Sequence, residues 1–185
     1  MERAVKTAGL TYEDYLALPE DGKRYEVVRG ELFVTPAPAP KHQIVISRLM
    51  DALLRFKREQ GLRGEVLTAP IDVVLAEDTF VQPDILFIPK ERLSIIGEKA
   101  ILGPPDLAIE VHSPSTHKLD HVTKRKAYAE LGVREYWIVD PELEQVEVFV
   151  LEEGRLDRRA EVLDGEVRSL AAIPGLGIPL AEIFS

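Results

Sequence analysis

The feature that most constrains the fold is a strand, a helix and a second strand that follow one another between residues 106 and 139. Asp106–Val111 is predicted to form an apolar strand, and Asp120–Leu131 a helix that ends at Gly132. Glu135–Val139 is predicted to form a second apolar strand directly afterwards. Two strands joined through a helix lie parallel in one sheet, connected by a crossover. This unit therefore predicts an α/β fold.

The rest of the chain supplies further strands and helices around this unit. Residues 41–60 carry apolar side chains at helical spacing and stop at Gly61, which predicts the longest helix. Two β-rich runs on either side of Gly30 predict an N-terminal hairpin over 25–35. Other strands are expected at 64–68, 71–75, 84–88 and 146–151 and in a hairpin around 164–165, with short helices at 11–18 and 179–184.

These elements predict a single domain over residues 1–185, because a chain of this length is enough for one sizeable core. The strands at 64–68, 71–75, 84–88 and 106–111 are expected to form a central mixed β-sheet flanked by helices, with the N-terminal hairpin beside it. No repeat or low-complexity tract divides the chain.

The composition excludes several kinds of site. The chain has no cysteine, so disulfides, zinc-thiolate sites and thiol catalysis are excluded, and any metal must be held by oxygen or imidazole. No apolar run approaches the ~18–20 residues that span a membrane, so a soluble cytoplasmic protein is expected. The formal net charge of −9 opposes constitutive tight binding to DNA, although a carboxylate-lined metal site with a local basic rim can still accept a phosphodiester.

Two carboxylates stand on apolar strands. Asp84 opens the run Ile85–Ile88, and Glu110 lies between Ile109 and Val111. A charged carboxylate buried in such a strand is costly unless it is paired or bound to a metal. A divalent cation shared by the two would meet this need, and oxygen-only ligation favours magnesium with manganese as a substitute. Taken singly, each has an equally good structural explanation: a turn cap at Asp84 and an arginine partner for Glu110.

Four blocks of sequence carry a resemblance to a known family. They are YEVVRGEL at 25–32, QPD at 82–84, PDLAIEVHSPS at 105–115 and GVREYWIVDP at 132–141. In their order and spacing, from about Tyr25 to Pro141, they resemble the Uma-type family of restriction endonucleases in the PD-(D/E)XK nuclease-like superfamily. The resemblance implies a restriction-endonuclease-like core, magnesium dependence and a DNA substrate.

The resemblance also implies the role of each acidic residue. Asp84 takes the position of the metal ligand in the family's proline-aspartate motif, and Glu110 that of the second acidic ligand. A lysine usually follows two residues after the second ligand. His112 stands there in this chain.

An alternative lysine lies on the following helix. Asp120, Lys124 and Tyr128 recur every fourth residue and therefore share one face. Lys124 is our candidate for the displaced catalytic lysine, which would orient or deprotonate the attacking water or steady the phosphorane. Without the resemblance, the run at 124–126 would indicate a solvated face.

Three other residues are weaker candidates. Glu26 on the first hairpin is expected to complete the metal shell, with Glu31 as the second choice for that position. His42 opens the long helix and is expected either to approach the site or a phosphate, or to serve only as a capping or surface residue.

The function predicted from these residues is that of a magnesium-dependent endonuclease that hydrolyses DNA phosphodiester bonds. The metal would position a water, neutralise the phosphoryl oxygens and help the leaving oxygen. A homodimer is expected, because two sites can then address both strands. Two alternatives stay open: a catalytically weak or inactive nuclease fold that binds nucleic acid or a protein partner, and a metal-dependent phosphoesterase acting on a small nucleotide.

Overall fold

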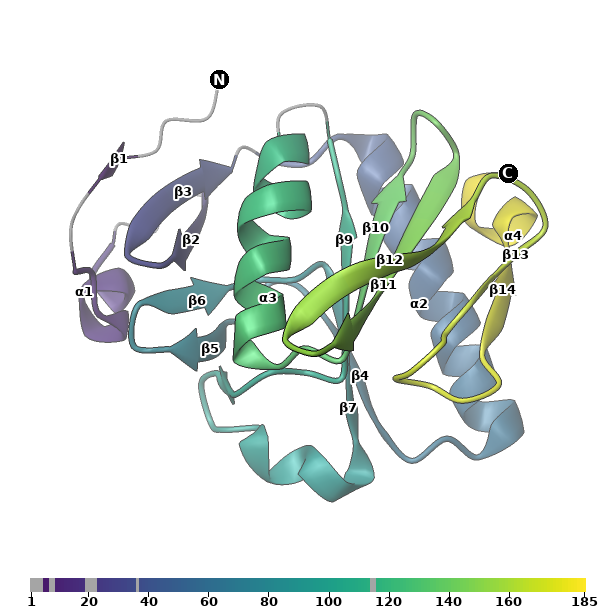
Figure 1. The fold of residues 1–185 in the computed structure, drawn as a ribbon, viewed down its shortest axis with the longest axis horizontal. Helices are drawn as coiled ribbons and strands as arrows, with labels where there is room; N and C mark the ends of the chain where they lie inside the picture. Colours follow the sequence, from purple (N-terminus) through teal and green to yellow (C-terminus); the bar gives the residue numbers. More distant parts are fainter. Residues whose placement is uncertain (1–4, 7–8, 19–22, 36, 114–115) are drawn as a thin grey trace.

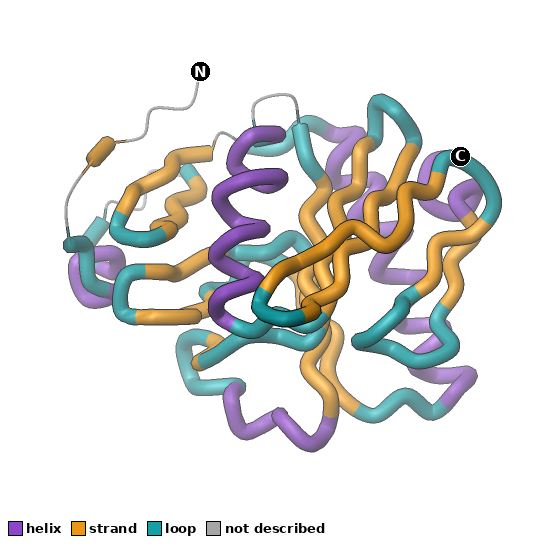
Figure 2. The backbone as a smooth tube through the Cα atoms, viewed as in Figure 1, coloured by secondary structure: helices purple, strands orange, loops and turns teal. Residues whose placement is uncertain are grey.

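The computed structural model describes residues 5–6, 9–18, 23–35, 37–113 and 116–185. It contains two large mixed sheets and a small hairpin, with helices packed on the sheets (Figures 1 and 2). No helix within these ranges is long and apolar enough to cross a membrane. Residues 114 and 115 of the third sequence block lie outside the described residues.

The first sheet contains the predicted strand–helix–strand unit and is the sheet that positions the site. Its six strands, in spatial order, are β12 (Arg155–Val162), β11 (Gln145–Glu152), β10 (Glu135–Asp140), β9 (Leu107–Val111), β7 (Ile85–Pro89) and β4 (Gly64–Thr68). β9 runs parallel to β10 and antiparallel to β7, so the predicted crossover is confirmed. β9 lies between these two strands, and every one of its residues is buried.

Helices cover both faces of this sheet. The long helix α2 (Pro40–Gln60) packs against alternate residues of the strands, including Ile85, Ile109 and Trp137. On the other face, a six-residue π-helix, η2 (Leu119–Lys124), continues into α3 (Arg125–Leu131) and packs against Leu86, Ala108 and Ile138. Figure 1 shows α3 on the near side and α2 on the far side. Because side chains alternate along a strand, Glu110 follows Ala108 onto the α3 face.

The second sheet holds the N-terminal hairpin. Its spatial order is β1 (Val5–Lys6), β3 (Glu31–Thr35), β2 (Arg24–Val28), β6 (Thr79–Val81), β5 (Val73–Ala76) and β8 (Ile101–Leu102). The hairpin predicted around Gly30 is confirmed, and Arg29 and Gly30 both adopt positive φ, as the tight turn between β2 and β3 requires. The short helix α1 (Tyr12–Leu16) packs its tyrosine rings on Phe80 of this sheet.

Two predictions about the sheets are wrong. The strand expected at 71–75 belongs to the second sheet as β5, because it pairs with β6 and β8 rather than with the central strands. The turn at 164–165 does not close a hairpin between its flanking strands. β13 (Glu166–Arg168) pairs instead with β14 (Gly177–Pro179), while β12 forms its hairpin with β11. Val167 on β13 contributes to the apolar cluster beneath α2, and this burial places β13 beside β14 rather than along β12.

The helices end close to where the sequence predicts. α2 stops at Gly61 and α3 at Gly132, both in the left-handed conformation that glycine adopts at little cost. A 3-10 helix, η1 (Lys90–Ile95), follows β7, and α4 (Leu180–Phe184) closes the chain as expected. The predicted helix at 120–131 differs in one respect, because its first turns are π-helical rather than α-helical.

Candidate functional site

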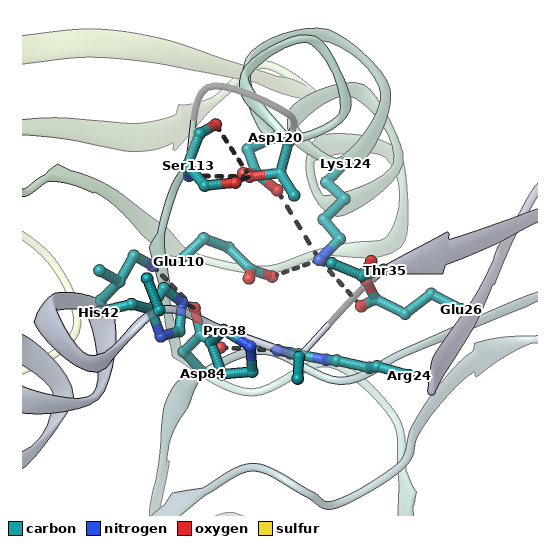
Figure 3. Close-up of a pocket in the computed structure, with 14 residues that line it drawn as sticks. Arg24, Glu26, Thr35, Pro38, His42, Asp84, Glu110, Ser113, Asp120 and Lys124 are labelled. Carbon is teal, nitrogen blue, oxygen red and sulfur yellow. Dashed lines mark hydrogen bonds and ion pairs between the residues drawn. The ribbon is translucent and has the colours of Figure 1, made fainter. Parts of the chain in front are cut away.

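A cavity of about 250 Å³ lies where the two sheets, α2 and the π-helix meet (Figure 3). Its lining contains four acidic side chains, two of the bases that pair with them, and one histidine: Glu26, Asp84, Glu110, Asp120, Arg24, Lys124 and His42. These residues come from segments far apart in the sequence. All four predicted site residues, Glu26, Asp84, Glu110 and Lys124, line this one cavity.

Asp84 is fixed in the bend directly before β7. Its Oδ1 accepts a hydrogen bond from Nη1 of Arg24 at 2.8 Å, and its Oδ2 accepts one from the backbone N–H of Val111 at 2.9 Å. The Nε2 of His42 lies 3.3 Å from Oδ2. Burial raises the pKa of Asp84, but the hydrogen bond from His42 and the charge of Arg24 outweigh it and bring the pKa to about 2. Asp84 is therefore held as a carboxylate.

Glu110 has far less support for its charge. The residue is only 3% exposed, and the two hydrogen bonds that its side chain accepts, from Nζ of Lys124 and the hydroxyl of Tyr128, both reach Oε1 at 2.9 Å. Burial raises the pKa of Glu110 to about 8, since the charge of Lys124 only partly opposes it and Asp84 and Asp120 add to the rise. The pKa of Asp120 is likewise raised to about 6, mainly by burial. The cavity thus holds more carboxylates than it neutralises.

Lys124 is the buried cation at the centre of these acids. Its Nζ lies 2.8 Å from Oε1 of Glu26, 2.9 Å from Oε1 of Glu110 and 3.8 Å from Oδ1 of Asp120. Figure 3 shows the three carboxylates converging on this amine. Burial lowers the pKa of Lys124, but Glu110 and Glu26 more than compensate and raise it. The predicted shared face of residues 120, 124 and 128 is confirmed, and it turns inward rather than to solvent.

The π-helix positions the side chain of Lys124. A π-turn widens the helix locally, and such turns occur often at functional sites. Here it spans Leu119–Lys124, and Asp120 and Lys124 are buried while His121 pairs with Glu147 on β11. Nothing in the sequence pattern distinguished this turn from an ordinary α-helix.

Glu26, the first choice to complete the metal shell, and Glu31, the second, occupy different surroundings. Glu26 is buried on β2, where its Oε1 also accepts a hydrogen bond from the backbone N–H of Gln82 at 2.8 Å. Burial raises the pKa of Glu26, but Lys124 and Arg24 lower it further than burial raises it. Glu31 lies opposite Val28 at the turn end of β3 and is not among the residues that line the cavity.

The two histidines near the predicted site have separate environments. His42 lines the cavity from the first turn of α2, and its buried Nδ1 has no hydrogen-bond partner among the described residues. His112, which stands where the family usually has its lysine, does not line the cavity. Its Nε2 lies 3.1 Å from Oδ2 of Asp140, and its ring packs edge-on against His117 and His121.

Arg24 is the cavity residue that sequence reasoning missed. It lies directly before Tyr25 at the start of β2, and no sequence pattern links it to its partner Asp84, sixty positions later. Its Nε and Nη2 are buried without a hydrogen-bond partner among the described residues. The one sequence feature that could have pointed to Arg24 is its position next to the β-rich run that begins at Tyr25.

The residues present fit a divalent cation by charge. Four carboxyl groups face two side chains that always carry positive charge, Arg24 and Lys124. Full ionisation would leave two negative charges in excess when His42 is left aside, and burial together with the acidic neighbours raises the pKa of Glu110 accordingly. Asp84 and Glu110 provide the oxygen donors that magnesium and manganese prefer. Among the described residues, no three histidine or acidic side chains are already arranged as a ligand set, so water would have to complete the coordination.

Comparisons with known proteins agree with this architecture. Residues 12–181 match the family model Uma2, described as "Putative restriction endonuclease". A solved structure described as a "putative nuclease belonging to DUF820" from Anabaena variabilis superposes with a TM-score of 0.77 at 20% identity, covering 95% of this chain and 97% of that one, which shows a shared fold.

Two further comparisons add little. The type IIG restriction endonuclease BpuSI aligns over 80% of this chain and 16% of the BpuSI chain at 14% identity. Its TM-score of 0.40 is too low to indicate a shared fold. A search of curated proteins finds no match. The family match covers most of the chain, and the chain therefore belongs to the Uma2 family.

Proposed function

We propose that this protein is an endonuclease that hydrolyses DNA phosphodiester bonds with magnesium, or manganese in its place, held by Asp84 and Glu110. The observation that carries the proposal is the buried cavity in which four carboxylates outnumber two permanent cations. Such an excess of buried charge is costly unless a cation offsets it. A bound divalent ion would offset it and supply charge neutralisation at the phosphoryl oxygens.

The other residues have roles that follow from their contacts. Lys124 carries a proton among three carboxylates, so its amine is suited to donate a hydrogen bond to an oxygen of the attacked phosphate or of the attacking water. Glu26 lies 2.8 Å from this amine, which favours a role in aiming it; direct ligation of the metal by Glu26 stays a prediction. Arg24 and His42 hold the carboxylate of Asp84 in place.

The test is cleavage of DNA by the purified protein in magnesium or manganese. The assay belongs at low ionic strength, because a chain of net charge −9 should bind DNA weakly and lose affinity steeply with salt. Asp84→Asn and Glu110→Gln should abolish both cleavage and metal binding measured by calorimetry. Lys124→Ala should slow cleavage while leaving metal affinity nearly unchanged.

A matched control separates a site effect from a general one. Asp157 is exposed on β12, so Asp157→Asn makes the same chemical change as Asp84→Asn at the surface and should cleave like the wild type. Equal cleavage by the wild type and Asp84→Asn would point to a contaminating nuclease and contradict the proposal.

One observation favours the alternative of a module that binds nucleic acid without cutting it. Asp84 already accepts hydrogen bonds from Arg24 and Val111 and lies beside His42, so a metal would have to compete with these partners. A module of this kind would bind oligonucleotides with the same affinity in magnesium and in a chelator, and would leave them intact.

A further inference from the structure

A second cavity, of about 360 Å³, adjoins the first on the other side of Asp84. It shares four lining residues with the first cavity: Arg24, Ala37, Pro38 and Asp84. Figure 3 shows Arg24, Pro38 and Asp84 together along one edge of the first cavity, which is the boundary between the two. A polymer with a phosphate at Asp84 would therefore extend into the second cavity.

The walls of the second cavity suit a flat, mostly apolar group. Ile46 of α2 and the pair Ala69-Pro70 after β4 provide apolar surface, and Pro38 closes the side nearest Asp84. The guanidinium of Arg24 is directed to Asp84 at 2.8 Å, so its charge is already engaged. Pockets of this size with apolar walls and a few polar groups are typical of small-molecule sites. Apart from the two basic side chains of the lining, Lys23 and Arg24, these walls fit a nucleobase.

One uncharged polar side chain at this cavity is available to contact a base edge. Gln43 projects from the first turn of α2 and is exposed, and its side-chain amide has no partner among the described residues. An amide offers one acceptor and two donors, which is the combination that pairs with the edges of nucleobases. Thr68 and Gln82, which also line the cavity, are already bonded to the Asp84 carbonyl and to Asp72.

We infer that the second cavity receives the base next to the phosphate that is cut, that Gln43 contacts the edge of this base, and that the substrate is therefore single-stranded or locally unpaired DNA. A base inside a duplex is stacked on both faces and paired at its edge, so it must leave the helix before it can enter a pocket. This inference rests on the proposed nuclease function and adds the class of substrate to it.

The experiment compares single strands and duplexes of the same sequence. Fluorescein-labelled oligothymidylates that carry one A, C or G at a central position are titrated by fluorescence anisotropy and then assayed for cleavage in manganese. The single strands should bind and be cut at least tenfold better than the duplexes. The four central bases should differ in affinity by roughly tenfold, the scale of one good base contact.

Variants at Gln43 test the assigned residue. Gln43→Ala should abolish the difference among bases, and Gln43→Glu should shift the preference toward cytosine, whose amino group donates to a carboxylate. Gln60→Ala is the matched control, because Gln60 is exposed at the opposite end of the same helix and should keep the wild-type preference.

Three outcomes would overturn the inference. Duplexes bound and cut as well as single strands would show that no base leaves the helix. A base preference unchanged by Gln43→Ala, or no preference in the wild type, would show that Gln43 does not contact a base. If DNA is still cut in these cases, the proposed nuclease function is unaffected. If the protein neither binds nor cuts any substrate, the inference and the proposed function are both contradicted.

Discussion

Glu110 and Glu135 are two buried glutamates on neighbouring parallel strands, and they are stabilised in opposite ways. Glu135 on β10 is 0% exposed and accepts five hydrogen bonds from neutral donors. They come from the indole of Trp137 at 2.6 Å, the hydroxyl of Ser169 at 3.0 Å, and the backbone N–H groups of the turn at 170–172. Glu110 on β9 has two donors, both on one oxygen, and three acidic neighbours.

This difference shows that burial of a carboxylate is not by itself a sign of function. The donors around Glu135 satisfy it completely and tie the C-terminal turn to the sheet, which is a structural task. Glu110 is left with an oxygen that accepts no hydrogen bond from a described residue and with uncompensated negative charge nearby. Unsatisfied charge of this kind, in a cavity, is what marks a candidate site.

The largest expected effect is on activity. Asp84→Asn and Glu110→Gln should each lower the DNA cleavage rate by roughly 10²–10³-fold or more, by analogy with the removal of one preorganised electrostatic group. The free energy of unfolding of Glu110→Gln should stay within about 1 kcal/mol of the wild type, because a desolvation cost is removed along with the charge. Single-turnover cleavage assays and urea titrations measure the two quantities. A large loss of stability in Glu110→Gln would make Glu110 a structural residue like Glu135.

The next largest effect is on stability, and it belongs to Glu135. Glu135→Gln should lower the free energy of unfolding by about 3 kcal/mol, because an amide presents its own donors to N–H groups that need an acceptor. Urea titration measures the loss, and Glu166→Gln is the control, because Glu166 is an exposed residue of β13. Cleavage per folded molecule should be unchanged. If Glu135→Gln is as stable as the wild type, Glu135 does not have the structural role that distinguishes it from Glu110.

Much of the fold was predictable because it depends on local signals. The apolar runs of β9 and β10, the helix between them and the glycines at 30, 61 and 132 each encode their own conformation. What failed depends on distant pairing. The turn at 164–165 is a real local feature, but which strand β13 would join is decided by the apolar cluster beneath α2.

In the candidate site too, residues in local motifs were predictable and contacts between distant segments were not. Asp84, Glu110, Glu26 and Lys124 were identified through the family's motifs, and the structure brings them to one cavity. Arg24 could not be found, because its contact with Asp84 joins two sheets. The sequence alone also could not separate Glu110 from Glu135, since each is a carboxylate beside an apolar strand run. Glu110 and Glu135 differ in the hydrogen-bond donors that surround them in the folded protein.

Metal addition should separate the two regions further. Manganese at a hundredfold excess over its dissociation constant should stabilise the wild type by about 2.7 kcal/mol, because the ion binds only the folded state. In thermal unfolding this corresponds to a rise of roughly 5–10 °C for a chain of this size. Asp84→Asn should lose the rise, and Asp157→Asn should keep it. An equal rise in all three proteins would assign the effect to ions at the surface.

A third glutamate sharpens the comparison, because it has a titratable partner. Glu147 on β11 lies opposite Ile138, as Glu110 does from the other side, so the three residues form one row across the sheet. Its carboxylate pairs with His121 and with Arg158, the latter at 2.6 Å. The hydrogen bond with His121 lowers the pKa of Glu147 to about 2 despite partial burial, and the same bond raises the pKa of His121.

The smallest expected effect is the pH dependence of this pair. The depressed pKa of Glu147 gives stability that is present above its usual value near 4.5 and is lost as the pH falls toward 2. The raised pKa of His121 gives stability that is present below 6.5 and is lost as the pH rises through its higher folded value. Glu147→Gln should therefore destabilise most between pH 4.5 and 6.5, by about 1 kcal/mol after screening by solvent. Urea titrations across pH 3 to 9 measure this, with exposed Glu59→Gln on α2 as the control.

Two neighbouring groups shape the pH profile. Arg158 still pairs with Glu147 at high pH, so part of the stabilisation persists there. His112, whose pKa burial lowers, contributes similarly to the wild type and to Glu147→Gln. A loss of stability independent of pH would mean that Glu147, like Glu135, is held by its donors alone.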